Sequence, residues 1–259
     1  MSGPGRSGAA TMTLPIDAHE TRQAAIEVKF LLEPDRAERV RAWARDHLAP
    51  DPHGGGAHGD AYRTATLYLD TTALDVFHRR GSYGRAKYRV RRYGATDVAF
   101  LERKLRRPRL LVKWRTSVPL AVLDALGTSG LAPGDPGHWF QRRIACRRLA
   151  PACVVGYTRL ARLGVAEGAP VRLTVDDDLR AWPAGGLALA ATGEGCPASP
   201  GRHILELKYR GRLPALFRRL VQDLALTPGT ISKYRLATTA LAGAGEPGAA
   251  VTPAGARYA

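Results

Sequence analysis

A basic run at residues 85–93, RAKYRVRRY, has the residue types and the spacing that phosphate binding requires. In a β-strand every second side chain points to the same face, so this run would place four cations together. These four are Arg85, Lys87, Arg89 and Arg91. Guanidinium groups bind phosphate oxygens through forked hydrogen bonds, and ammonium groups supply compact neutralising charge. The run therefore indicates an anion-binding strand, although a solvated surface strand would have the same pattern.

The same alternation of charged residues with Val, Leu, Phe or Tyr recurs in other parts of the chain. The recurring charged positions are Glu27 and Lys29, Glu102 and Lys104, Lys113 and Arg115, Arg159, Arg172, and Glu206 and Lys208. Cations packed together in a low-dielectric interior repel one another strongly, so an enclosed arrangement requires a polyanion between them. We therefore expect a sheet closed on itself, with the charges inside and helices covering its apolar outer face.

The number of cations bears on the size of the anion. A triphosphate carries about four negative charges near neutral pH, fewer than the cations that the strands supply. The strand candidates are Lys29, Arg89, Arg91, Lys104, Lys113, Arg159, Arg172 and Lys208, with Lys87 and Arg115 on the same faces. This excess favours a phosphate chain longer than the tail of one nucleotide.

Four carboxylates lie close in sequence to these cations. Glu27, Glu102 and Glu206 each precede a lysine by two residues, and Asp176 follows Arg172 by four. They either neutralise the cations or bind a divalent cation that bridges phosphate oxygens, and oxygen ligands suit Mg²⁺ or Mn²⁺. The two roles are equally open for Glu27 and Glu102, whereas we favour metal binding for Glu206.

Familiar nucleotide-binding and hydrolase motifs are absent from the sequence. It has no GxxxxGK[ST] phosphate loop, GxGxxG fingerprint, HExxH zinc motif or GxSxG nucleophile motif. His53 and His58 lie in a flexible segment at 49–60 without a cluster of Cys or carboxylate ligands, so we do not expect a metal there. Side chains would then handle the phosphate, and phosphoryl transfer requires chiefly positioning and charge stabilisation.

Composition narrows the partners and the compartment. The 259 residues carry 39 Lys and Arg against 23 Asp and Glu, a net charge of +16 that indicates an anionic partner. Aromatic residues make up 7% of the chain, and Tyr88 on the basic strand faces away from the cations, so specific nucleic-acid binding is not expected. Three cysteines without CxxC spacing predict a reducing, cytoplasmic location. We expect a soluble protein, because the sequence has no signal-peptide core and no run of about 18 apolar residues.

Hydrophobic periodicity and turn residues predict an α+β fold. Strands are predicted near 25–32, 62–70, 83–93, 97–105, 110–118, 153–163, 170–177, 186–191 and 202–209. Helices are predicted at 34–48, within a helical insertion at about 119–150, and at 214–226 and 231–241. The short connections favour a closed, mostly antiparallel β-barrel tunnel of about eight strands with helices packed outside. Residues 1–23 and 242–259 are expected to be disordered segments on either side of one domain at 24–241.

An ordered set of motifs accompanies these elements. It consists of RVRRYG at 89–94, FLERK at 100–104, VKWR at 112–115, YTR at 157–159, RLTVDDDL at 172–179, LELK at 205–208 and SKY at 232–234. With these motifs the chain resembles, over about 24–240, the vacuolar transporter chaperone (VTC) catalytic domain. That domain is the polyphosphate polymerase domain of the triphosphate tunnel metalloenzyme (CYTH-like) superfamily.

The resemblance implies an activity and a set of roles. The family transfers the terminal phosphate of ATP to inorganic polyphosphate and leaves ADP, with Mn²⁺ or Mg²⁺ as cofactor. Glu206 would hold the metal, and Lys233 would lie near the end of the tunnel. The residues implied to bind the triphosphate or the growing chain are Arg89, Arg91, Lys104, Lys113 and Arg159.

The chain departs from the pattern of its relatives at two positions. Ala25 stands where the wider superfamily has the first Glu of an ExExK strand, which makes a two-metal hydrolase less expected, and Thr230 stands where the polymerases have a second lysine. A triphosphatase and a non-catalytic polyphosphate-binding module are the alternatives. The eukaryotic relatives carry an inositol-phosphate-sensing domain and membrane spans, so transport coupled to synthesis would here need a separate membrane protein.

Overall fold

A computed structural model describes residues 19–21, 25–54, 59–107, 110–127, 130–189 and 191–244. Most of the two segments that we predicted to be disordered, and His58, lie outside these residues. Two boundaries of the predicted segments differ from the structure: residues 19–21 form a strand, and the last helix continues to Ala244.

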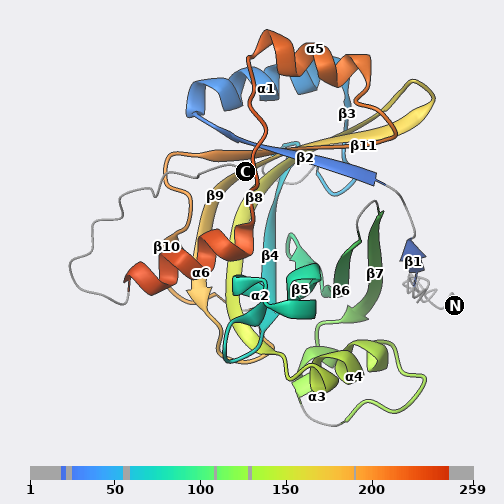
Figure 1. The fold of residues 1–259 in the computed structure, drawn as a ribbon, viewed down its shortest axis with the longest axis vertical. Helices are drawn as coiled ribbons and strands as arrows, with labels where there is room; N and C mark the ends of the chain where they lie inside the picture. Colours follow the sequence, from blue (N-terminus) through green and yellow to red (C-terminus); the bar gives the residue numbers. More distant parts are fainter. Residues whose placement is uncertain are drawn as a thin grey trace, which may run out of the picture.

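The fold is α+β, as predicted, and is built on one curled antiparallel sheet (Figure 1). Its main strands are β1 (His19–Thr21), β2 (Ala25–Leu32), β4 (Ala61–Asp70), β5 (Ala86–Tyr93), β6 (Val98–Arg107), β7 (Leu110–Pro119), β8 (Ala150–Ala166), β9 (Ala169–Pro183) and β11 (His203–Arg210). They run in the order β1-β7-β6-β5-β4-β8-β9-β11-β2, and the short strands β3 (Ala49–Pro50) and β10 (Cys196–Pro197) pair with β8 and β9. The strands from β4 to β7 pair in chain order, and so do β8 and β9, as short connections predict.

The sheet is open, so the prediction of a closed barrel is wrong. Its two end strands are β1 and β2. β1 occupies the outer edge of β7, where Glu20 pairs with Trp114, and this is the edge that β2 would need in order to close the sheet. A side-chain contact crosses the concave face instead, because Lys104 Nζ on β6 lies 2.5 Å from Glu27 Oε2 on β2.

Helices cover the outside of the sheet. They are α1 (Pro34–His47), α2 (Asp75–His78), α3 (Val122–Gly127), α4 (His138–Cys146), α5 (Ala215–Asp223) and α6 (Lys233–Ala244), with a 3₁₀ turn at Gly81–Arg85. Pro34 begins α1 at a position where a missing backbone N–H has no consequence. Figure 1 shows α1 and α5 side by side over β2 and β11. Val40, Phe217 and Leu205 pack there in one buried cluster, which leaves the concave face to polar side chains.

Two predicted strands are altered by local backbone geometry. The prediction of a strand near 186–191 is wrong for the residues of that range that the structure describes. Gly186 has a φ of 109°, and residues 186–187 form a bend. β10 occupies that edge of β9 instead. The strand predicted from 83 begins at Ala86, so Arg85 lies exposed in the 3₁₀ turn and does not join the row of cations. Helices α3 and α4 fall inside the predicted helical insertion at 119–150.

No helix in the described part of the chain has the length and apolarity needed to cross a membrane. The longest helix is α1, whose 14 residues include several charged side chains.

A buried carboxylate, Asp70, joins α6 to the end of β4. Its oxygens accept hydrogen bonds from the backbone N–H groups of Val76 (2.8 Å) and Phe77 (2.9 Å) and from the Tyr234 hydroxyl (2.5 Å). The Tyr234 ring also packs against Tyr68, with 5.2 Å between ring centroids. This contact places the first turn of α6, and with it Lys233, at the concave face.

We expect Tyr234→Phe to lower the free energy of unfolding by about 1–3 kcal/mol, because the buried Asp70 oxygen loses one donor while the ring packing is kept. Urea unfolding measures the change. Tyr209→Phe, at a similarly buried ring on β11, is the control and should change stability less. Equal effects of the two substitutions would contradict an anchoring role for Tyr234.

Candidate functional site

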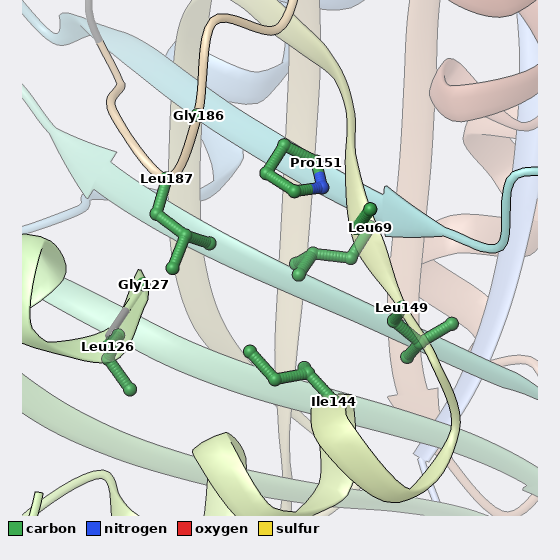
Figure 2. A pocket seen from close by; sticks show the side chains of 9 residues that line it. Leu69, Leu126, Gly127, Ile144, Leu149, Pro151, Gly186 and Leu187 are labelled. Carbon is green, nitrogen blue, oxygen red and sulfur yellow. The ribbon is translucent and has the colours of Figure 1, made fainter. Parts of the chain in front are cut away.

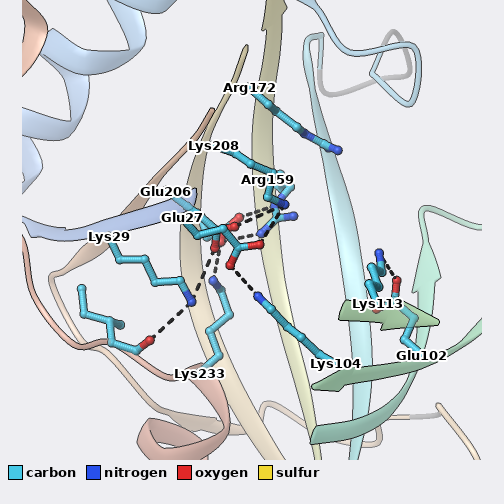
Figure 3. Close-up of polar contacts among 12 residues, drawn as sticks. Glu27, Lys29, Glu102, Lys104, Lys113, Arg159, Arg172, Glu206, Lys208 and Lys233 are labelled. Carbon is cyan, nitrogen blue, oxygen red and sulfur yellow. Dashed lines mark hydrogen bonds and ion pairs between the residues drawn. The ribbon is translucent and has the colours of Figure 1, made fainter. Parts of the chain in front are cut away.

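The concave face of the sheet gathers cations from seven strands and one helix. These eleven side chains are Lys29 (β2), Lys87, Arg89 and Arg91 (β5), Lys104 (β6), Lys113 and Arg115 (β7), Arg159 (β8), Arg172 (β9), Lys208 (β11) and Lys233 (α6). Figure 3 shows many of them pointing into the space that the curled sheet encloses. The structure thus brings together the cations that we predicted from the sequence. The predicted carboxylates, in contrast, lie in three separate clusters among them.

Glu102 is the centre of the first cluster. Its side chain is fully buried, with Arg89 Nε at 2.6 Å, Lys113 Nζ at 2.6 Å and Arg115 Nε at 3.3 Å from its oxygens. Burial alone would raise the pKa of Glu102, but the surrounding cations, Arg89 foremost, hold it well below its usual range. Because three cations surround this carboxylate, the geometry favours the neutralising role over metal binding for Glu102.

Asp176 is the centre of the second cluster. Arg159 binds it with two nitrogens, Nε to Oδ1 at 2.5 Å and Nη2 to Oδ2 at 2.8 Å, and Lys233 Nζ lies 2.5 Å from Oδ2. Burial opposes the charge of this carboxylate, yet Arg159 and Lys233 lower its pKa. The link from Arg159 on β8 to Lys233 on α6 is a contact between distant segments, which the sequence alone did not indicate.

Glu27 and Glu206 form the third cluster, on neighbouring strands. Lys208 Nζ lies 3.1 Å from Glu27 Oε1 and 3.7 Å from Glu206 Oε1, and Lys29 Nζ lies 3.6 Å from Glu206 Oε2. Burial and Glu206 each raise the pKa of Glu27, but Lys208 and Lys104 lower it to about 2. Two carboxylates therefore stay charged side by side, which is the arrangement that a cation would stabilise further.

The donor set of the third cluster fits a divalent cation that is also bound by phosphate. Mg²⁺ is commonly held by one or two carboxylates together with substrate phosphates, rather than by a complete protein cage. Glu27 and Glu206 supply such a pair. Among the described residues no group of three or more His, Cys, Asp and Glu side chains could hold a metal ion, so Glu102 and Asp176 do not complete this site.

The remaining predicted cations lie at the two ends of the concave face. Lys87 Nζ donates to the Ser232 hydroxyl at 2.8 Å, next to Lys233 in the sequence. At the other end, Arg172 Nη2 lies 2.7 Å from Asp51 Oδ2 and 3.1 Å from the Tyr62 hydroxyl. The face is therefore cationic along its whole length.

Two lysines have pKa values that are lowered toward neutral pH. Burial is the main cause that lowers the pKa of Lys87 to about 7, and Lys29 and Lys104 lower it further. Burial likewise lowers the pKa of Lys113 to about 8, although Glu102 opposes the shift. These lysines would become more fully charged when an anion binds beside them.

Aromatic contacts to the cations were missed by the sequence reasoning. The ring centroid of Tyr157 lies 5.2 Å from the Arg159 guanidinium carbon and 5.1 Å from Lys233 Nζ. Such contacts favour a cation over the face of an aromatic ring. The two-residue spacing of Tyr157 and Arg159 on one strand could have indicated this contact, but only Arg159 was predicted to belong to the site.

An apolar pocket lies away from these charges, between helices α3 and α4 and the end of β4 (Figure 2). Its volume is about 300 Å³, and Leu69, Leu126, Ile144, Leu149 and Leu187 contribute to its lining. Leu69 and the inward-facing Tyr68 are consecutive on β4, so the pocket opens on the opposite face of the sheet. It takes no part in the anion site.

The chain belongs to the VTC domain family, whose model, described as "VTC domain", matches residues 24–242. The chain is also similar to three solved structures. A Bacillus halodurans protein, described as a candidate adenylate cyclase, is 12% identical with a TM-score of 0.49, over 81% of this chain and 96% of its own. HpAC1 from Hippeastrum, described as revealing a dominant triphosphatase activity, is 11% identical with a TM-score of 0.49. The match covers 83% of this chain and 96% of HpAC1. PH1819 from Pyrococcus horikoshii is 12% identical with a TM-score of 0.46, and the match covers 82% of this chain and 97% of PH1819. No curated protein matches the sequence.

We expect Glu102→Gln to lower the free energy of unfolding by about 3–5 kcal/mol in the absence of polyanions, because Arg89, Lys113 and Arg115 lose their buried counter-charge. Urea unfolding at low salt measures the loss. Glu194→Gln, at an exposed carboxylate paired with Arg180, is the matched control and should leave stability unchanged. A stable Glu102→Gln variant would contradict the neutralising role.

Replacement of Lys87 by Met should stabilise the protein without ligand, and the gain should depend on pH. The folded state holds the pKa of Lys87 near 7, below its usual 10.5, so folding opposes the protonated form. This penalty is complete below about pH 7 and disappears as the pH rises toward 10.5. Thermal unfolding should therefore show a gain of several degrees at pH 6 that shrinks steadily up to pH 10. Arg85→Met, at the exposed cation two residues earlier, should show no such trend.

Proposed function

We propose that this chain is a metal-dependent polyphosphate polymerase, which transfers the terminal phosphate of ATP to a growing inorganic polyphosphate chain. One observation carries the proposal: eleven cations share one concave face with fewer carboxylates, in a chain of the VTC domain family. These carboxylates are Glu27, Glu102, Asp176, Glu206 and, at one end, Asp51. The surplus of positive charge exceeds the roughly four negative charges of a single triphosphate. A longer chain of phosphates would use the rest.

The proposed reaction breaks the bond between the γ-phosphorus of ATP and the oxygen that bridges it to the β-phosphate. A terminal oxygen of the polyphosphate chain forms the new P–O bond, and ADP leaves with the electron pair. Catalysis of this kind depends on positioning and on stabilising the charge of the transferred group. The residues that we propose for this role are Arg89, Arg91, Lys104, Lys113, Arg159 and Lys233, with Lys29, Lys87, Arg115, Arg172 and Lys208 extending the binding face.

The internal ion pairs support a face that is prepared for its substrate. Glu102 and Asp176 hold Arg89 and Arg159 in place before any anion arrives. Arg91 is buried, and its Nε donates to the Thr66 hydroxyl at 3.0 Å. Prepositioned guanidinium groups avoid the reorganisation that flexible surface cations would require.

A divalent cation, Mn²⁺ or Mg²⁺, would be held by Glu206 with Glu27 beside it, and when bound it would neutralise charge on phosphate oxygens. The chain's own residues would position the phosphate chain along the concave face. Transport of the product, if it is coupled to synthesis, would be the task of a separate membrane protein.

We expect the purified protein to form ADP and longer phosphate chains from ATP, Mn²⁺ and a short polyphosphate primer. Arg91→Ala should lower kcat/KM at least about 100-fold, because a buried guanidinium that binds the transferred group is lost. Arg92→Ala is the matched control: Arg92 is the next residue on β5, with its Nε bonded to the Thr96 carbonyl, and its loss should change the rate little.

Product analysis separates the proposal from its alternatives. Release of orthophosphate without chain growth would identify a triphosphatase. Tight polyphosphate binding with no turnover of ATP under Mg²⁺ or Mn²⁺ would identify a binding module. Either result would overturn the polymerase assignment.

A further inference from the structure

Aromatic side chains follow the row of cations at one end of the concave face. On β5 the inward-facing positions are Lys87, Arg89, Arg91 and then Tyr93, so the fourth member of the row is an aromatic ring. Since a strand rises about 3.4 Å per residue, Tyr93 lies about 7 Å beyond Arg91 along the strand. The change from charge to ring marks a change in the chemistry that this end of the face can bind.

Three further rings gather around Tyr93, and we call the four residues the aromatic platform. The His53 ring stacks on Tyr93 with 5.1 Å between centroids and 22° between planes, and it lies 5.9 Å from Tyr62. Tyr62 meets Tyr93 edge-on at 5.8 Å, and Phe100 lies 5.4 Å from Tyr93. The platform therefore draws on β4, β5, β6 and the segment after β3.

Two rings of the platform are buried and the other two are accessible to solvent. Tyr62 and Tyr93 are 5% and 8% exposed, whereas His53 is exposed and Phe100 is half-buried. The Arg115 guanidinium lies 3.6 Å from the centroid of Phe100, which adds a planar cation to the accessible part. Flat groups, some of them charged, thus face the end of the cationic row.

The position of His53 is fixed by its neighbours. The buried Asp51 accepts a hydrogen bond from the His53 backbone N–H at 2.9 Å and pairs with Arg172 at 2.7 Å. Arg172 in turn bonds to the Tyr62 hydroxyl. The ring of His53 is therefore held at the platform by contacts that do not involve its own imidazole nitrogens.

An inorganic phosphate chain has no flat group that could stack on these rings. A nucleobase does, and bases stack on aromatic and guanidinium planes with little dependence on base identity. Tyr93 lies beyond Arg91 at about the distance that a ribose would bridge between a phosphate and its base. This spacing connects the platform to the phosphate-binding row.

We infer that the aromatic platform binds the nucleobase of a nucleoside triphosphate whose phosphates lie along Arg91 and Arg89. The inference rests on the proposed function, and it adds an orientation: the base lies at the Tyr93 end, and the phosphates point toward Lys87 and Lys233. The opposite end of the face is then left for the polyphosphate chain.

Binding of ATP and of inorganic tripolyphosphate to the full chain, measured by calorimetry without divalent metal, tests this inference. His53→Ala should weaken ATP binding about fivefold to tenfold and leave tripolyphosphate binding unchanged, because only ATP carries a base. His53→Phe keeps a flat ring and should restore most of the ATP affinity. His47→Ala is the matched control, since His47 is also exposed and stacks on an aromatic ring, Trp43, at 4.4 Å on the outer helix α1.

The outcomes separate this inference from the proposed function. Suppose that the wild-type protein binds tripolyphosphate and ATP, and that His53→Ala weakens the binding of both equally or of neither. The nucleobase then does not lie on the platform, but the proposed anion site is still supported. If the wild-type protein binds neither ligand, even after Mg²⁺ is added, the proposed function fails and the inference fails with it. Loss of ATP affinity in His53→Ala alone, with recovery in His53→Phe, is the supporting result.

Discussion

Repulsion among like charges on an enclosed surface is the constraint on which this structure depends. The concave face collects cations from nearly every long strand, and many of them are largely removed from water. Glu102 is bound by Arg89, Lys113 and Arg115, and Asp176 is bound by Arg159 and Lys233. Without these internal counter-charges the face could not remain folded in the absence of a bound anion.

The internal carboxylates neutralise the face only in part. Their number is smaller than that of the cations, and the pKa of Lys87 falls to about 7 because burial and neighbouring cations oppose its charge. The unliganded face is therefore stable enough to persist but still strongly attractive to a polyanion. A polyanion that entered the face would replace water and relieve the remaining repulsion.

The open sheet holds these charges on one concave face, and side-chain contacts join its two ends. β1 covers the edge of β7, and the contact between Lys104 and Glu27 spans the concave face where backbone pairing between the end strands would otherwise close the sheet. The helices α1 and α5 bury the apolar side of β2 and β11, and Tyr234 and Asp70 anchor α6 so that Lys233 reaches Asp176. The candidate anion site therefore lies mainly on strands, while one helix contributes a single cation at its end.

The sequence was enough to predict which strands carry cations on one face, because the period of two in Lys87, Arg89 and Arg91 is a local property of the backbone. It also determined the α+β class and the helices at either end of the domain, through apolar spacing and turn residues. The tertiary structure alone decided that the sheet stays open, that Glu102 neutralises cations, and that Glu27 and Glu206 meet as a pair. It also decided that His53 reaches Tyr93 and that Lys233 reaches Asp176. These outcomes depend on how strands far apart in the chain pair and curl, and the charges that meet across a curled sheet are not set by the spacing along any one strand.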